Sequence, residues 1–140
     1  MVKHTPKANF TPDCEALRAN FSLVSEQIEK GNILSAYAIG FGGVAEALAK
    51  MSFGNEVGVN VNLSEGELFD YNYGSILVEA TAPIEGAILV GETVAEKSLT
   101  INGEVLDMAE LYRANTERFE KVYPARCLNG EPCQIGRAHV

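Results

Sequence analysis

Residues 32–55 read NILSAYAIGFGGVAEALAKMSFGN, and this stretch decides the fold. Its first part, residues 33–39, is an apolar run that is too short for a secure helix and is bounded by glycines, so we expect an extended strand there. Gly42 and Gly43 follow, and residues 44–52 then place apolar side chains on one face at helical spacing. A Gly-Asn pair ends this run. The stretch therefore predicts a strand, a glycine turn and a helix in direct succession.

A longer helix is predicted upstream of this stretch. Thr11 is the expected N-cap, Pro12 suits the first helical position, and Gly31 lies just past the end. Its apolar stripe covers one face, which must pack on another layer, and consists of Leu17, Phe21, Val24 and Ile28. Residues 1–10 are polar and without periodicity, so we expect a lead-in strand or linker.

Strands dominate the sequence downstream. Residues 57–63 alternate apolar and polar side chains, as a half-buried strand does. Residues 75–81 and 84–90 are apolar runs that predict two more strands. Asn102-Gly103 is the preferred dipeptide of a type I′ turn and predicts a hairpin between residues 99–101 and 104–106. A last helix is expected from Asp107 to Pro124.

The predicted order is helix, strand, helix, several strands, helix. Grouped strands flanked by helices favour an α+β fold over alternating βαβ units, with a mixed or antiparallel sheet layered with helices. The chain has 140 residues, of which 46% are hydrophobic and 21% charged. This length and composition suit one globular domain.

Charge and cysteine content narrow the class of protein. The formal net charge is −8 and the sequence has no basic run, which makes nucleic acid and anionic membranes poor partners. No stretch reaches 18 apolar residues, and the N-terminus lacks the apolar core of a signal peptide. The three cysteines, Cys14, Cys127 and Cys133, form no C-x-x-C pair. We expect a cytoplasmic protein without a metal site.

The glycine turn is the main candidate site. Backbone N–H groups at a helix start bind anions such as phosphate, and Gly42 and Gly43 would let a ligand approach the backbone. The alternative is a tight turn that lets the helix pack closely on its neighbours. Glu79 interrupts an apolar run, which fits either an outward strand face or a site. Tyr71 and Tyr73 could stack a base or simply pack. No nucleophile motif is present.

Taken together, residues 32–55, Gly74 to Glu79 and Val90 to Val94 resemble a known family. They are similar to the C-terminal domain of the aminoimidazole ribonucleotide synthetase-related proteins, and within these to the large phosphoribosylformylglycinamidine synthases. The resemblance covers about residues 5–125. It implies an α+β fold like that C-terminal domain.

The resemblance also implies an activity for the parent enzyme, the ATP- and glutamine-dependent conversion of formylglycinamide ribonucleotide to the amidine in purine biosynthesis. ATP and Mg²⁺ would serve the parent enzyme, and we expect this fragment to bind neither alone. Relatives carry His-Asp and Asp where this chain has Tyr37-Ala38 and Phe41. The implied phosphate or substrate contacts are therefore Gly42, Gly43 and, more weakly, Ser35, with no catalytic residue and no metal ligand. The roles of Glu79 and Glu92 stay open.

The expected organisation follows from the resemblance. Residues 1–125 form the synthetase C-terminal-type domain, and residues 126–134 form a linker toward a missing domain. Residues 135–140, IGRAHV, match the translation of a sequencing adapter, ATC GGA AGA GCA CAC GTC, and are expected to be an artefact.

The expected partners are the sister synthetase domains, the glutaminase domain and the ribonucleotide. The fragment alone should be inactive and could self-associate through an uncovered sheet edge. The alternative function is a stand-alone, non-catalytic α+β ligand-binding or interaction module.

Overall fold

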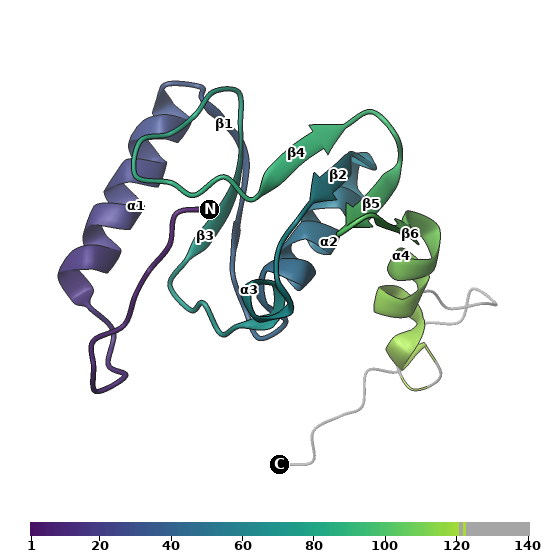
Figure 1. Cartoon of the computed structure of the whole chain (residues 1–140), viewed down its shortest axis with the longest axis horizontal. Helices are drawn as coiled ribbons and strands as arrows, with labels where there is room; N and C mark the ends of the chain where they lie inside the picture. Colours follow the sequence, from purple (N-terminus) through teal and green to yellow (C-terminus); the bar gives the residue numbers. More distant parts are fainter. Residues whose placement is uncertain (121, 123–140) are drawn as a thin grey trace, which may run out of the picture. The chain divides into compact units, whose positions relative to one another are not determined.

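The computed structural model describes residues 1–120 and 122, which form two compact units, residues 1–108 and a second unit beginning at Ala109 (Figure 1). The helices and strands of the first unit, in chain order, are α1 (Cys14–Glu29), β1 (Ile33–Ala38), α2 (Gly43–Asn55), β2 (Gly58–Val61), α3 (Glu65–Phe69), β3 (Ile76–Ala80), β4 (Gly91–Val94), β5 (Ser98–Ile101) and β6 (Glu104–Asp107). The remaining elements are α4 (Met108–Thr116) and the 3₁₀ turn η1 (Glu117–Phe119).

The strand, glycine turn and helix predicted from residues 32–55 are confirmed as β1, the turn at Gly40–Gly43 and α2. Helix α2 buries Val44, Ala47 and Leu48 on one face. It ends at Asn55, and its C-cap, Glu56, adopts the left-handed conformation with φ 52°. The small residues at its start, Gly42 and Gly43, therefore allow a buried helix to begin a few residues after a strand, as the sequence predicted.

Two sheets make up the β layer. Strands β1 and β3 pair antiparallel, with Ser35 opposite Glu79 and Tyr37 opposite Leu77. The second sheet has the order β4-β2-β5-β6, in which only β2 and β5 run parallel. One antiparallel sheet and one mixed sheet, together with the helices, confirm the α+β class.

The predicted hairpin is confirmed. Asn102 and Gly103 both have positive φ, 53° and 84°, which is the signature of a type I′ turn. The Asn102 side chain also reaches outside the hairpin: its Oδ1 accepts from the Leu63 N–H at 2.9 Å and its Nδ2 donates to the Leu63 carbonyl at 2.8 Å. The turn is thus fastened to the end of β2.

The start of α1 differs from the prediction. The N-cap is Asp13, whose carboxylate accepts from the Glu15 and Ala16 N–H groups at 3.1 and 3.2 Å. Thr11 was the expected cap, but its hydroxyl donates to Asn9 Oδ1 at 2.6 Å instead. An ionised carboxylate at the positive end of a helix is the stronger cap.

The apolar stripe predicted for α1 is buried only in part. Val24 is 7% exposed, whereas Phe21 and Ile28 are each about half exposed, at 53% and 51%. These side chains are exposed because the sheet that α1 contacts, β1-β3, has two strands and is too narrow to cover the whole apolar face of the helix. Val24, Val2 and Ile33 form the core of this part, with Leu23, Ile76 and Val78 packed against it.

The strand predicted at residues 84–90 is wrong, because the structure has a loop there and the next strand, β4, begins at Gly91. Ile88 and Leu89 in this loop are 49% and 81% exposed. A strand needs a neighbour along its length to satisfy its backbone groups. Among the described residues, the backbone of residues 84–90 pairs with another segment only at Ile88, whose N–H and carbonyl bond to Met1.

The last predicted helix is shorter than expected. Helix α4 begins after Asp107 as predicted but ends at Thr116, whose hydroxyl donates to the Tyr112 carbonyl at 2.9 Å, and η1 follows. Such a bond to the preceding turn competes with a regular helix. Pro124, Cys127, Cys133, the linker at 126–134 and the adapter-like residues 135–140 lie outside the described residues.

Candidate functional site

The glycine turn is built by close approach of two segments. Gly43 has φ 68°, a conformation that favours glycine, and its N–H donates to the Gly40 carbonyl at 3.2 Å. A Cβ at Gly43 would lie 2.4 Å from the Leu68 carbonyl oxygen of α3. Gly43 is therefore needed so that the start of α2 can rest on the backbone of α3.

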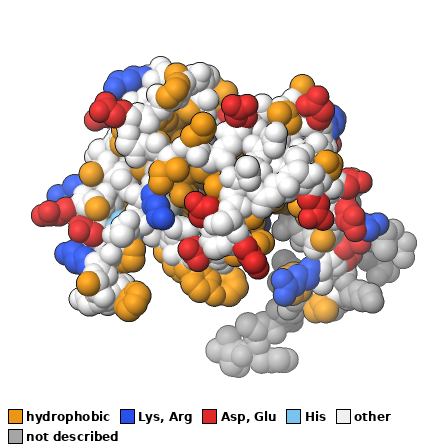
Figure 2. Space-filling model, in the orientation of Figure 1, with side chains coloured by type: hydrophobic (Ala, Val, Ile, Leu, Met, Phe, Trp, Pro, Cys, Tyr) orange, Lys and Arg blue, Asp and Glu red, His pale blue; other side chains and the backbone are white. Residues whose placement is uncertain are grey.

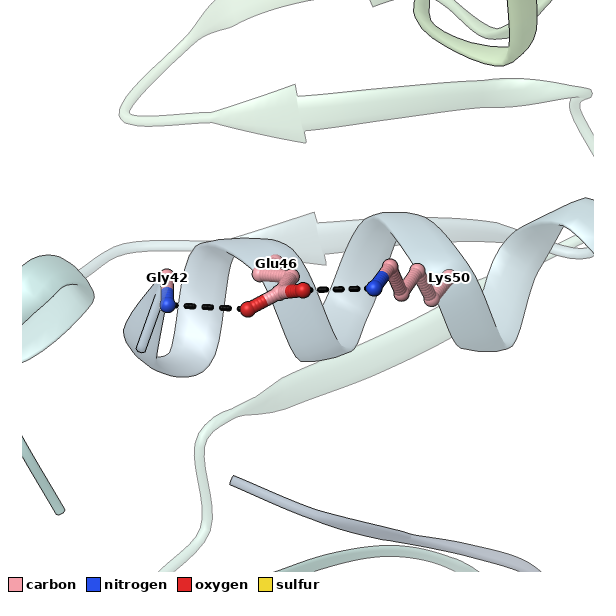
Figure 3. Close-up of polar contacts among 3 residues, drawn as sticks. All are labelled: Gly42, Glu46 and Lys50. Atoms are coloured by element: carbon pink, nitrogen blue, oxygen red, sulfur yellow. Dashed lines mark hydrogen bonds and ion pairs between the residues drawn. The ribbon is translucent and has the colours of Figure 1, made fainter. Parts of the chain in front are cut away.

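A carboxylate of the chain itself reaches the turn (Figure 3). Glu46 Oε2 accepts from the Gly42 N–H at 2.8 Å, and Glu46 Oε1 accepts from Lys50 Nζ at 2.5 Å. The hydrogen bond from Lys50, and next that from Gly42, lower the pKa of Glu46, while the Glu46 and Tyr37 contacts raise the pKa of Lys50. The Gly42 donor that a phosphate could use is thus occupied by Glu46.

Gly42 is required for this arrangement as well. It is the N-cap of α2 and contributes no side-chain cap of its own. A Cβ there would lie 2.6 Å from the Glu46 Cβ and 2.7 Å from its Oε2. Because Gly42 has no side chain, the Glu46 carboxylate has room to accept from the Gly42 N–H and to cap the helix.

Ser35 lies in β1, and its hydroxyl points to a different partner. Ser35 Oγ donates to Glu79 Oε2 at 3.0 Å across the β1–β3 pair. The structure therefore brings Gly42 and Gly43 together at one turn, while Ser35 belongs to a pair with Glu79. The sequence offered one signal for this pair, the charge that Glu79 places within an apolar run.

Glu79 also lines a groove of about 760 Å³ in the first unit. Its walls come from β3, residues 81–90, β4 and the buried side of α2, and most of the lining side chains are apolar. In Figure 2, hydrophobic side chains gather near the middle of the viewed face. A groove of this size with few polar groups is typical of a binding site.

The polar side chains that line the groove are Ser52, Glu79, Thr81, Glu92 and Thr93. Ser52 is 2% exposed, and its hydroxyl has no hydrogen-bond partner among the described residues. Sequence reasoning left the roles of Glu79 and Glu92 open, and it missed the groove altogether. The groove depends on how two sheets meet, which no local pattern reports.

Exposed aromatic rings flank the glycine turn. Phe41 and Tyr71 have ring centroids 5.4 Å apart, and Tyr71 stacks with Tyr73 at 6.1 Å. All three are more than half exposed. Since the rings contact one another while remaining open, the geometry is compatible with either of the two predicted roles, base stacking or packing.

The described residues hold no group of three or more His, Cys, Asp or Glu side chains that could bind a metal ion. Within the described chain, no helix has the length and apolar character that a membrane span requires. Cys14 is exposed and carries a free thiol.

Comparison with known proteins gives relatives for part of the chain. Phosphoribosylformylglycinamidine synthase subunit PurL from two strains of Lactobacillus delbrueckii subsp. bulgaricus is 32% identical over 94 residues, which cover 59% of this chain and 13% of the relative. The PurL of Picrophilus torridus is 36% identical over 75 residues, 49% of this chain and 10% of the relative.

No family model and no solved structure matches the chain. The chain matches only about a tenth of the length of these much larger relatives. Their names nevertheless agree with the family that residues 32–55 resemble. Over about half of its length, the chain is therefore similar to a segment of phosphoribosylformylglycinamidine synthase subunit PurL.

Proposed function

We propose that this chain is a C-terminal-type synthetase domain that works as part of a phosphoribosylformylglycinamidine synthase in purine biosynthesis. The observation that carries the proposal is the 32–36% identity to PurL over 75–94 residues. The reaction would convert formylglycinamide ribonucleotide to the amidine at the expense of ATP, with ammonia from glutamine. The ATP, the Mg²⁺ and the glutaminase would be contributed with the rest of the enzyme.

The proposed contribution of this domain is a phosphate or substrate contact at the glycine turn, through the backbone N–H groups of Gly42 and Gly43. What supports it is the turn itself, which places glycines at the start of a helix of 13 residues. A phosphate would have to displace the Glu46 carboxylate from the Gly42 N–H. Ser35 is the weaker candidate, because its hydroxyl is already engaged by Glu79.

A chimeric enzyme tests the proposed function. The segment of Lactobacillus PurL that aligns with this chain is replaced by the corresponding residues of this chain, and the chimera is expressed in a purine auxotroph lacking its own enzyme. We expect growth without added purine, and ammonia-dependent ADP release with formylglycinamide ribonucleotide in the purified chimera. A chimera that folds, as judged by circular dichroism and sizing chromatography, but shows neither would contradict the proposal.

The isolated chain provides the complementary measurement. We expect no ammonia-dependent ATP turnover with the ribonucleotide, because the nucleotide-binding lobe would belong to another domain. Turnover above the blank would show that this chain is a self-sufficient enzyme and would overturn the proposed division of labour. The stand-alone binding module would be favoured by an inactive chimera combined with an inactive, stably folded chain.

A further inference from the structure

The first two residues of the chain form a piece of β-structure between two other segments. The Val2 N–H and carbonyl pair with the Ile76 carbonyl and N–H of β3, at 2.8 and 2.9 Å. Met1 turns the other way: its ammonium donates to the Ile88 carbonyl at 2.6 Å and its carbonyl accepts from the Ile88 N–H at 2.8 Å. Successive residues that pair on opposite sides behave as a strand inside a sheet.

The edge of β3 beyond this pairing is open. The Ser75 carbonyl accepts from the Ile39 N–H, and the Thr81 N–H donates to the Asn32 carbonyl. The backbone N–H and carbonyl groups of the odd-numbered residues of this segment therefore face β1. The backbone groups of Val78 and Ala80 therefore face the same side as those of Ile76, away from β1. None of the described residues pairs with them, although Ile76 is paired with Val2.

The segment on the far side is open as well. Strand β4 is an edge strand, bonded to β2 on one side only. Residues 88–90 lead into it with exposed apolar side chains, Ile88 and Leu89. The groove lies between these two edges, since Val78, Ala80, Leu89 and Gly91 all line it. Figure 1 shows the N-terminus at this place, beside β3 and near β4.

We propose that this groove is a slot for one extended strand that continues Met1–Val2 in the upstream direction and joins β3 to β4. The inference rests on the proposed function, since such a strand would be supplied by residues that precede Met1 in the parent enzyme. The strand would run antiparallel to both neighbours. The two sheets would then become one, in the order β1-β3-new strand-β4-β2-β5-β6.

The register fixes the chemistry of the occupant. With Val2 opposite Ile76, the first residue before Met1 lies opposite Val78, the second opposite Glu79 and the third opposite Ala80. Val2, Ile76 and Val78 belong to the apolar core, so the first and third residues should be apolar. The second residue shares its face with Glu79, so Lys, Arg or Thr suits it.

The state of Met1 supports the same inference. Burial lowers the pKa of its ammonium, because the charge is partly withdrawn from water. A peptide N–H in this place would keep the hydrogen bond to Ile88 and carry no charge. A strand that continues upstream from Met1 would therefore keep this pairing with Ile88.

The test adds three residues directly before Met1, preceded by the same Met-Thr in every variant. One variant carries Val-Lys-Val, the matched control carries Gly-Ser-Gly, and a charge control carries Val-Glu-Val. We expect Val-Lys-Val to slow amide hydrogen exchange at Val78 and Ala80 at least about tenfold relative to Gly-Ser-Gly. Leu77 and Glu79, which face β1, should be unchanged. The Tm of the Val-Lys-Val variant should exceed that of the Gly-Ser-Gly variant by about 4 °C. The Val-Glu-Val variant should show a smaller increase.

Equal exchange at Val78 and Ala80 in the Val-Lys-Val and Gly-Ser-Gly variants would overturn the slot. The reading frame upstream of Met1 in the source DNA provides a second test, and proline or a charged residue at the first or third position would also overturn it. Neither measurement depends on enzyme activity. The exchange experiment can therefore contradict the proposed strand even if the chimera is active. An inactive chimera, in turn, leaves the proposed strand untouched.

Discussion

Glu46 caps its own helix by accepting the backbone N–H of Gly42 at 2.8 Å. The residue that would ordinarily cap α2 is a glycine without a side chain, and the carboxylate four residues later takes over that role. Lys50, one turn further, holds the other carboxylate oxygen. One charged side chain thus connects the glycine turn to the body of the helix.

Replacing Glu46 by Gln should lower the free energy of unfolding by about 1 kcal/mol, because a charge-assisted hydrogen bond becomes a neutral one. Chemical denaturation of both proteins measures the difference. Glu26→Gln is the matched control, since Glu26 and Lys30 form an exposed pair at 3.7 Å. The control should change stability by less than about 0.5 kcal/mol. Equal effects of the two substitutions would show that Glu46 does not act as a cap.

The same contact predicts a pH dependence. The pKa of Glu46 is lowered in the folded state, so its contribution to stability is complete above the unfolded pKa of about 4.3. It is lost as the pH falls through the lowered folded pKa. Denaturation curves between pH 7 and pH 3 should therefore converge for the wild type and Glu46→Gln at the acidic end. A gap that stays constant down to pH 3 would contradict this.

Gly43→Ala should destabilise the chain by about 2 to 4 kcal/mol, since the positive φ and the contact with the Leu68 carbonyl both oppose a Cβ. Gly31 is the control, because its φ of 74° is similar but nothing lies within 4 Å of a Cβ there. Gly31→Ala should cost about 1 kcal/mol. Similar losses in the two variants would mean that α3 yields to the added methyl group.

Ser52→Ala should stabilise the chain by about 1 kcal/mol, because it removes a buried hydroxyl that has no partner among the described residues. Part of any gain comes from the higher helix propensity of alanine, about 0.5 kcal/mol. Ser22→Ala, at an exposed position of α1, measures that part alone. If Ser52→Ala gains no more than Ser22→Ala, the Ser52 hydroxyl has a partner in solution.

Ser35 and Glu79 should show coupling in a double-mutant cycle of Ser35→Ala and Glu79→Gln. The 3.0 Å hydrogen bond is partly buried, so its loss should cost about 1 kcal/mol, with a coupling energy of at least about 0.5 kcal/mol. Additive losses would indicate that the two side chains do not interact in solution.

Sequence reasoning predicted what is encoded locally. The glycine pair and the spacing of Val44 and Leu48 identified the start and buried face of α2, and Asn102-Gly103 identified the hairpin, because a turn with two positive φ values accepts few residues. Contacts between segments that are distant in the sequence could not be predicted from local patterns. The pairing of Ser35 with Glu79 depends on strand register, and the failure of the strand at 84–90 depends on a missing neighbour.

The sequence predicted the glycine turn and the helix start, but not the Glu46 carboxylate that accepts from the Gly42 N–H. Gly42 and Gly43 do form a turn at a helix start, as expected. A glutamate four residues beyond a glycine N-cap is a usable signal for the Glu46 cap, although the sequence alone does not say whether the side chain turns back or faces solvent. In the structure, one Glu46 oxygen accepts from the Gly42 N–H and the other accepts from Lys50, one helical turn away.

The double hydrogen bond between Asn102 and Leu63 has a consequence for the order of folding. The β5–β6 hairpin closes a loop of two residues and can form early, whereas the parallel pairing of β2 with β5 must close about 40 residues. Asn102 sits at the tip of the early element and reaches the end of β2. We expect its two hydrogen bonds to Leu63 to stabilise the slow, long-range pairing of β2 with β5 once that pairing has formed.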